Sequence, residues 1–373
     1  MATIGIGIIG TGFAKHSYLP IFQAHPGARV VALCGRSPDR TAALAREREI
    51  SAAYTDYRAL LKDAAVEAVY IAVPHDLHHA IVSAAVGSGR HVLCEKPLAL
   101  NLDQALSLCD QAQAAGVTHQ VAFLHRELPA NRELARLLKA GRLGALRHAL
   151  FYSLQSVAAI PNAPFTWRDQ AARTGVGGAL GDTGAHLIDL LQSLVGRIQR
   201  VCGTSRRFVV CHQDSVTGQA MSGDAPDAVS FVAEVAGGGQ CLMQVSFAAT
   251  GCGLDQILTL SGSEGSLSTE LHTEPPRGMR WHQLFATEPG KTGLRPSALV
   301  EDPAPNATSP MDGMRTDFQA AMSRVADGFL RAIAEGSSLA PTFHDGAQCQ
   351  AVVEAVMQSA NSGEWAAVRQ IAG

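Results

Sequence analysis

The sequence predicts two domains: an α/β domain with a parallel sheet, followed by an α+β domain with an open, mainly antiparallel sheet. Two observations support this prediction. Up to about residue 124, short apolar runs alternate with helical patterns, which is the order of βαβ units. Beyond that point, strand-like runs follow one another with turns between them, which favours antiparallel pairing. We therefore expect the first domain at residues 1–124 and the second at residues 125–373.

In the first domain, nearly continuous apolar runs indicate strands of a sheet that is covered on both faces. The expected strands are residues 4–9, 29–34, 68–73, 91–94 and 118–122. The expected helices are residues 14–25, 38–48, 56–62, 76–87 and 101–115. Pro38 and Asn101 stand at positions that are typical of a helix start.

In the second domain, helices are expected at 127–140 and 187–195, and a proline-rich surface loop at 288–311. Two more helices are expected near 312–335 and 344–361. The expected strands are residues 146–156, 198–210, 228–236, 239–249, 255–262 and 265–271. Few helices are available to cover the strands near 228–262, so we expect one sheet face to bind a partner chain in a homodimer or homotetramer.

Composition limits the classes of function. The 373 residues carry a net charge of −3 with scattered basic residues, which argues against nucleic acid or a charged membrane surface as a partner. No apolar run approaches the roughly 20 residues of a membrane span. The N-terminus lacks the basic region of a signal peptide, so we expect a cytoplasmic protein. The eight cysteines form no C-x-x-C pair, which favours buried free thiols over disulfides or a metal site.

A glycine turn follows the first strand. Gly10, Thr11, Gly12 and Phe13 stand where the strand leads into the first helix. One glycine allows a tight turn, and the next lets the backbone approach a pyrophosphate that is bound by helix N–H groups. Lys15 replaces the third glycine of the usual pattern, which leaves the local helix–strand packing open. A plain glycine turn is the alternative.

The end of the second strand predicts the choice of dinucleotide. An acidic residue here would bind the ribose 2′-hydroxyl of NAD, but Gly35 stands at that position. Arg36, Ser37 and Arg40 are instead suited to hold a 2′-phosphate. We therefore expect NADP as the cofactor, with NAD possible. Arginines that are merely solvated on the surface are the alternative.

Two further motifs carry candidate chemistry. Lys96 follows the strand at 91–94 and should point into the cleft at the carboxyl ends of the strands, unless it is an ordinary surface lysine. Asp182 and His186 are four residues apart, so on a helix they share one face. A histidine beside a carboxylate is a plausible general base. A helix cap and a buried core histidine are the alternatives.

These motifs, in this order, resemble those of the Gfo/Idh/MocA oxidoreductase family. The resemblance rests on the glycine turn, on Glu95-Lys96-Pro97 and on Asp182-x-x-x-His186. It extends to Pro74-His75-Asp76-Leu77-His78, where His75 replaces the family's usual asparagine, and to Trp167-Arg168 ahead of Gly177-Gly178. It implies a Rossmann-type first domain and a second domain with an open sheet.

The resemblance also implies hydride transfer between nicotinamide and a hydroxyl-bearing carbon of a sugar, cyclitol or related polyol. His186 would be the acid/base, Lys96 would stabilise the substrate oxygen, and Asp182 would bind a substrate hydroxyl or orient His186. Further cofactor contacts are expected from Pro74, His78, Glu95, Lys96, Trp167 and Arg168. No metal is expected. A redox-neutral glycosidase with tightly held NAD and a non-catalytic NADP-binding protein remain as alternatives.

Overall fold

The computed structural model describes residues 3–160, 162–274, 281–288, 291–302 and 310–372. Its internal contacts divide the chain into two units, which are described separately. The first unit contains residues 1–123, 322–350 and 371–373, and the second contains residues 124–321 and 351–370. The division passes through the last two long helices, whereas the sequence analysis assigned all residues after 124 to one domain. Two domains at 1–124 and 125–373 therefore remain a proposal.

The first unit contains a six-stranded parallel sheet with the order β3-β2-β1-β4-β5-β6. This is the strand order of a Rossmann fold, as the sequence predicted. Its strands are β1 (Ile4–Ile9), β2 (Ala28–Cys34), β3 (Ala52–Tyr54), β4 (Ala68–Ile71), β5 (His91–Cys94) and β6 (His119–Val121). The edge strand β3 was not predicted; its three residues are only partly buried.

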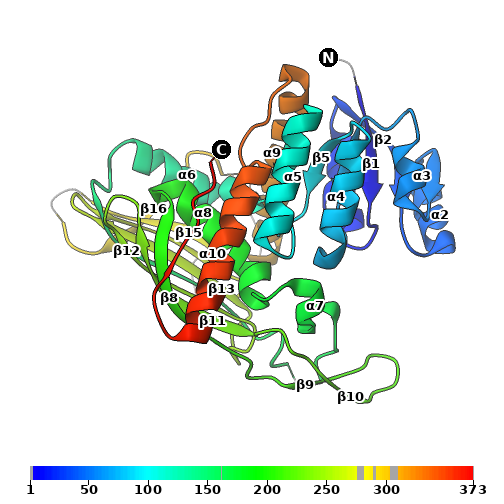
Figure 1. Cartoon of the computed structure of the whole chain (residues 1–373). Helices are drawn as coiled ribbons and strands as arrows, with labels where there is room; N and C mark the ends of the chain where they lie inside the picture. Colours follow the sequence, from blue (N-terminus) through cyan, green and yellow to red (C-terminus); the bar gives the residue numbers. More distant parts are fainter. Residues whose placement is uncertain (1–2, 161, 275–280, 289–290, 303–309, 373) are drawn as a thin grey trace. The chain divides into compact units, whose positions relative to one another are not determined.

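The helices of the first unit lie close to their predicted positions. They are α1 (Tyr18–Ala24), α2 (Pro38–Glu47), α3 (Tyr57–Leu61), α4 (His78–Gly87) and α5 (Leu102–Ala115), with short 3-10 turns at Ala14–His16 and His75–Leu77. The predicted helix 14–25 is interrupted at Ser17, where the backbone leaves the helical region. The Asn101 side chain caps α5 by accepting the Gln104 N–H at 2.9 Å, and α4 packs between α3 and α5 (Figure 1).

The second unit contains a nine-stranded sheet with the order β16-β15-β14-β13-β7-β12-β11-β8-β17. Only the β7–β12 pair is parallel, so the prediction of a mainly antiparallel sheet is confirmed. Its strands are β7 (Leu146–Gln155), β8 (Ile198–Arg206), β11 (Ala228–Val235), β12 (Gln240–Ser246), β13 (Leu254–Gly262), β14 (Ser266–His272), β15 (His282–Thr287), β16 (Leu294–Ser297) and β17 (Ala366–Ala367).

Two predictions for the second unit were wrong in detail. The loop expected at 288–311 contains strand β16, which pairs with β15; residues 289–290 and 303–309 of that loop lie outside the described residues. The strand expected at 198–210 ends at Arg206, and the chain then forms a separate hairpin of β9 (Cys211–Gln213) and β10 (Ala220–Ser222).

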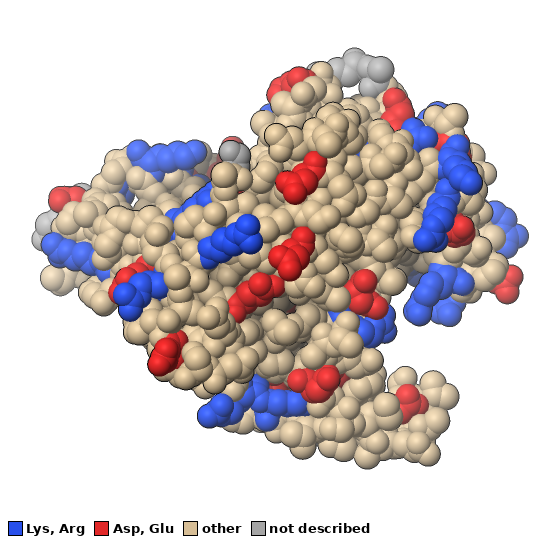
Figure 2. Space-filling model, in the orientation of Figure 1, with Lys and Arg blue, Asp and Glu red and all other residues tan. Residues whose placement is uncertain are grey.

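The helices of the second unit are α6 (Pro129–Lys139), α7 (Ala171–Thr174) and α8 (Ala185–Val195), with short turns at Leu124–Glu127, Trp167–Asp169 and Leu180–Gly184. Helix α6 packs against β14 and β15, and α8 packs against β7 (Figure 1). The division between the units falls within α9 (Pro310–Glu335) and α10 (Phe343–Ser362). Among the described residues, no helix is long and apolar enough to cross a membrane. Acidic and basic side chains are interspersed over the visible face of the molecule (Figure 2).

Candidate functional site

The predicted dinucleotide turn is shaped by two glycines with different roles. Gly10 has a φ of +98°, and a Cβ on it would lie 2.1 Å from the carbonyl oxygen of Ala72. Only glycine fits there, because β1 and the chain after β4 approach so closely. A Cβ on Gly12 would meet nothing within 4 Å, so its exposed backbone lies open to a ligand. This arrangement fits a pyrophosphate.

The end of β2 is crowded by two threonine side chains. A Cβ on Gly35 would lie 2.6 Å from the Thr41 hydroxyl oxygen and 2.8 Å from the Thr11 hydroxyl oxygen. Arg36 and Arg40 are exposed where α2 begins, and within the described part of the chain their guanidinium groups form no hydrogen bond or ion pair. These cations are therefore available to an anionic ligand.

Lys96 lies between two residues that are anchored to other elements of the first unit. On one side, the buried Tyr70 hydroxyl of β4 donates to Glu95 Oε1 at 2.7 Å. On the other side, Nδ1 of His78 lies 2.7 Å from the carbonyl oxygen of Pro97, and its Nε2 lies 3.0 Å from that of Val73. The backbone that carries Lys96 is thus held from both sides.

Burial determines the protonation of these anchors. It raises the pKa of Tyr70 well above its usual value, and the neighbouring Glu95 charge adds to this effect. The phenol therefore remains a donor. Burial also lowers the pKa of His78, whose side chain is fully buried. Both ring nitrogens face backbone carbonyls in the loops after β4 and β5, and the ring is not exposed to solvent.

In the second unit, Asp182 and His186 lie in one continuous helical segment. Asp182 belongs to a π-helical turn, Leu180–Gly184, which leads directly into α8 and His186. Single π turns occur frequently at functional sites. The buried Asp182 carboxylate accepts from Nε of Arg168 at 2.8 Å, and the Arg168 guanidinium lies 4.4 Å from the Trp167 ring centre. Of the two predicted cofactor residues, Arg168 thus binds Asp182 and also stacks on the Trp167 ring.

The residues that contact His186 form no local sequence motif. The His186 ring stacks on the buried His125 ring, with centres 4.2 Å apart and planes 5° apart. Arg126 forms a bidentate ion pair with Asp189 of α8, with distances of 2.7 and 2.5 Å. His186 and Asp189 are three residues apart, so their spacing could have indicated that both side chains lie on one face of the helix. Nothing in the sequence indicated His125, because its partner lies 61 positions away.

The structure divides the predicted catalytic triple between the units, with Lys96 in the first and Asp182 and His186 in the second. All eight cysteines are free thiols; five are buried, whereas Cys211 is exposed, contrary to the expectation of buried thiols. Among the described residues, no group of three or more His, Cys, Asp or Glu side chains could hold a metal ion. Two cavities of about 490 and 410 Å³ are lined by other residues.

Two family models match this chain. Residues 4–123 match the oxidoreductase family with an NAD-binding Rossmann fold, and residues 131–268 match the GFO/IDH/MocA C-terminal domain. A relative that is 30% identical, inositol 2-dehydrogenase 2 of Saccharopolyspora erythraea, aligns over 98% of this chain and 96% of its own. The chain belongs to the Gfo/Idh/MocA oxidoreductase family.

Other members of the Gfo/Idh/MocA family support this assignment over the whole length. Levoglucosan dehydrogenase of Pseudarthrobacter phenanthrenivorans is 28% identical over 397 aligned positions, which cover both chains completely. A structure of levoglucosan dehydrogenase in complex with NADH and levoglucosan superposes with a TM-score of 0.86 at 26% identity, covering 99% of this chain and 100% of that one. The predicted family, fold class and oxidoreductase activity are thereby confirmed.

Proposed function

We propose that the protein is an NAD(P)-dependent dehydrogenase that acts on the CH–OH group of a sugar, cyclitol or related polyol. The observation that carries the proposal is the Asp182–His186 segment, where a buried carboxylate and a buried histidine are both held by side chains of the second unit. Relatives that act on levoglucosan and inositol support the substrate class.

The cofactor supplies the hydride acceptor, and the protein has to bind it and manage one proton. Gly10, Thr11, Gly12 and Phe13 would hold the pyrophosphate, since the open space at Gly12 fits it. Pro74, Glu95 and Trp167 stay as proposed cofactor contacts. For His78, whose ring is fully buried, we propose an indirect contribution through the backbone carbonyl to which its single ring N–H donates, that of Pro97 or that of Val73.

The proposed chemistry assigns one task to each polar group. His186 would take the proton of the substrate hydroxyl during oxidation and return it during reduction. Lys96 would hydrogen-bond the same oxygen and stabilise its developing negative charge. Asp182 would bind a substrate hydroxyl, with its carboxylate oriented by Arg168. The anchors on both sides of Lys96 support a role that requires a fixed position.

We further propose a preference for NADP over NAD. Gly35 stands where NAD recognition uses an acidic residue, and the Arg36 and Arg40 guanidinium groups are available for a 2′-phosphate. The levoglucosan dehydrogenase structures contain NADH, so cofactor choice varies within the family if this proposal holds.

We also propose a cytoplasmic homodimer or homotetramer that associates through the open sheet face. Val232, Leu242 and Leu150 are directly opposite one another on β11, β12 and β7, and each is 40–47% exposed. Such a row of exposed large apolar side chains across a sheet is typical of a contact surface. Sedimentation of the protein at micromolar concentration would measure this, and a stable monomer would refute it.

One experiment tests the activity. The purified protein would be incubated with a panel of sugars and polyols, beginning with levoglucosan and inositol, and absorbance at 340 nm would be followed with NADP and with NAD. Formation of reduced cofactor with at least one substrate is the expected result. Conversion of a glycoside without any net absorbance change would instead favour the redox-neutral reaction.

A further inference from the structure

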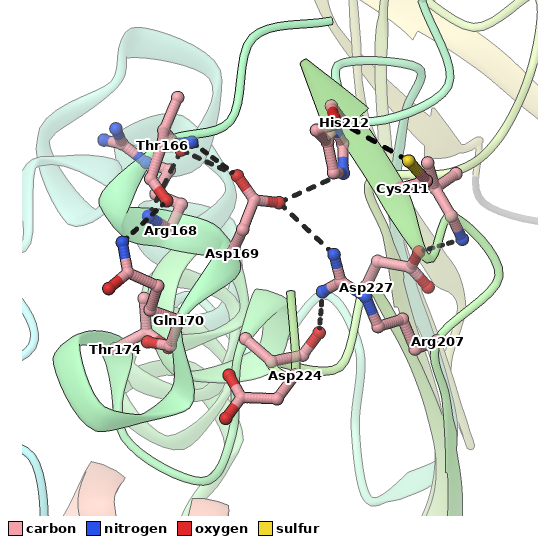
Figure 3. Close-up of polar contacts among 12 residues, drawn as sticks. Thr166, Arg168, Asp169, Gln170, Thr174, Arg207, Cys211, His212, Asp224 and Asp227 are labelled. Atoms are coloured by element: carbon pink, nitrogen blue, oxygen red, sulfur yellow. Dashed lines mark hydrogen bonds and ion pairs between the residues drawn. The ribbon is translucent and has the colours of Figure 1, made fainter. Parts of the chain in front are cut away.

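A cluster of buried polar side chains in the second unit meets at Asp169 (Figure 3). Asp169 ends the 3-10 turn Trp167–Asp169. Its Oδ2 accepts the Thr166 N–H at 2.8 Å and the Thr166 hydroxyl at 3.1 Å. Its Oδ1 lies 3.2 Å from Nε2 of His212 and 3.6 Å from Nη2 of Arg207. One carboxylate oxygen is therefore hydrogen-bonded to the turn, whereas the other lies within ion-pair distance of a distant segment but forms no hydrogen bond with His212 Nε2 or Arg207 Nη2.

The turn that Asp169 closes also carries the partner of Asp182. Thr166 Oγ1 accepts the Arg168 N–H at 3.2 Å, which completes a capping box around the turn. Arg168 leaves this turn to donate its Nε–H to the Asp182 carboxylate. The backbone conformation that Asp169 imposes thus determines where the Arg168 side chain starts and how it reaches Asp182.

The distant segment, residues 207–227, is called the arm here; it carries the β9–β10 hairpin. Both of its ends return to Asp169. At the first end is Arg207, whose Nη1 donates to the Ala225 carbonyl at 2.5 Å. At the second end, the Asp224 and Ala225 N–H groups donate to the Asp169 carbonyl at 2.9 and 3.2 Å. The two ends of the arm, which are called its roots and consist of residue 207 and residues 224–225, are therefore hydrogen-bonded to each other, and the second root is hydrogen-bonded to the turn.

The arm has little apolar packing of its own to hold it. Its large apolar side chains Phe208, Val210 and Val216 are 67%, 59% and 90% exposed. In contrast, the Arg207 and Asp169 side chains are each 13% exposed, and that of His212 is 3% exposed. Because Arg207 and Asp169 are largely shielded from water, removing the Asp169 charge would leave the Arg207 charge uncompensated. The polar cluster is thus one anchor of the arm, beside the backbone hydrogen bonds that Gln213 forms with Ala163 and Phe165.

We propose that Asp169 is a positioning residue for the substrate-binding carboxylate Asp182, acting through Arg168 and anchoring the arm to the same turn. The assignment of substrate binding to Asp182 rests on the proposed function; the link between arm and turn does not. Asp169 needs no contact with substrate or cofactor in this role. A change at the roots of the arm should consequently displace the Asp182 carboxylate and alter substrate binding, even though neither Asp182 nor His186 is substituted.

Two variants test the proposal by different routes. Asp169→Asn removes the charge that Arg207 and His212 face, with little change in shape. Gly223→Ala changes no charge, but a Cβ on Gly223 would lie 2.3 Å from Nη2 of Arg207 and 2.5 Å from the Asp169 carbonyl oxygen. It therefore forces the roots of the arm away from the turn. Asp214→Asn is the matched control, because the hydrogen bonds described for the Asp214 side chain are with Val216 and Thr217 at the exposed tip of the arm.

The first measurement is hydrogen–deuterium exchange of the whole protein without substrate, which does not depend on the proposed activity. Asp169→Asn and Gly223→Ala should both accelerate amide exchange in residues 166–170 and at both roots of the arm. Asp214→Asn should affect only the tip. Unchanged exchange at residues 166–170 in both test variants would overturn the link between arm and turn.

The second measurement separates binding from turnover on an identified substrate. We expect kcat/KM to fall about 10- to 100-fold in both test variants, mainly through KM, as a small displacement of a positioning group can cause. Dissociation constants for NADPH should rise less than KM, because Trp167 is only one of several proposed cofactor contacts, and unchanged circular dichroism spectra would show that the fold is intact. Accelerated exchange with unchanged KM would refute the positioning role. Absence of any turnover by the wild-type protein would refute the proposed function alone.

Discussion

The two halves of the proposed site are built by different means. The nucleotide turn of the first unit depends on backbone geometry: Gly10 fits where a Cβ would collide, and Gly12 leaves open space. The site of the second unit depends on side chains that hold other side chains, such as Arg168 on Asp182 and His125 on His186. A site made of backbone leaves a recognisable local motif, whereas a site made of side-chain contacts draws on residues that are distant in sequence.

The largest expected effect separates chemistry from binding. His186→Ala and Lys96→Met should each lower kcat by roughly 10²–10⁴-fold, the usual contribution of a positioned proton-transfer group. NADPH affinity should change little, because the glycine turn and the arginines bind the phosphates. Turnover on an identified substrate and NADPH fluorescence titration would measure both quantities.

The double variant His186→Ala, Lys96→Met sharpens this test. It should be little worse than either single variant, since groups that act as a unit are not additive. Wild-type turnover in His186→Ala would contradict the assigned mechanism and favour a binding protein that performs no chemistry.

The next test compares the two glycines of the turn. Gly10→Ala should destabilise the fold by roughly 1–3 kcal/mol, because its φ of +98° and the nearby Ala72 carbonyl both oppose a Cβ. Gly12→Ala should leave the melting temperature unchanged, yet weaken NADPH binding by about tenfold or more, because the new methyl group enters the space assigned to the pyrophosphate. Thermal denaturation and cofactor titration of both variants would distinguish the roles. Unchanged NADPH affinity in Gly12→Ala would mean that the pyrophosphate lies elsewhere.

Cofactor selectivity gives an effect of similar or smaller size. Arg36→Ala should weaken NADP binding by roughly 1.5–3 kcal/mol, the range for a hydrogen bond to a charged group, and leave NAD binding unaffected. Arg46→Ala is the control, as Arg46 is an exposed arginine in the last turn of the same helix α2. Equal losses for both cofactors, or a wild-type preference for NAD, would contradict the NADP assignment.

The sequence predicted most of the fold because most strands form continuous apolar runs. It missed β15 and the short strands β3, β9, β10, β16 and β17; of these, β16 contains Pro296 and lies in a proline-rich segment. Proline is tolerated there because β16 is the edge strand of its sheet. A local pattern cannot reveal that a partner strand will be available at an edge.

The residues of the candidate site that lie in short local motifs could be predicted from the sequence, whereas their distant partners could not. Glycines, Lys96, Asp182 and His186 were identified from short patterns, and their roles remain predictions. The residues that support them were missed, since Tyr70 reaches Glu95 over 25 positions and Arg207 reaches Asp169 over 38. Such pairs have no spacing rule; only the folded chain brings them together.

The smallest expected effect on turnover tests whether the first unit also depends on a side-chain contact. Tyr70→Phe removes the hydroxyl that donates to Glu95 at 2.7 Å inside the protein. Since Glu95 stays buried with one donor fewer, unfolding free energy should fall by roughly 1–3 kcal/mol. Tyr54→Phe is the matched control: its hydroxyl donates to Asp63 at 3.0 Å near the surface, so its effect should stay within about 0.5 kcal/mol.

The same variant also tests whether the Glu95 anchor positions Lys96. If Tyr70→Phe lowers kcat severalfold without changing NADPH affinity, the anchor does position Lys96, and the first unit also depends on side-chain contacts, though less than the second unit does. If kcat is unchanged, the backbone alone suffices to hold Lys96. Urea denaturation and steady-state kinetics on the two variants decide between these outcomes.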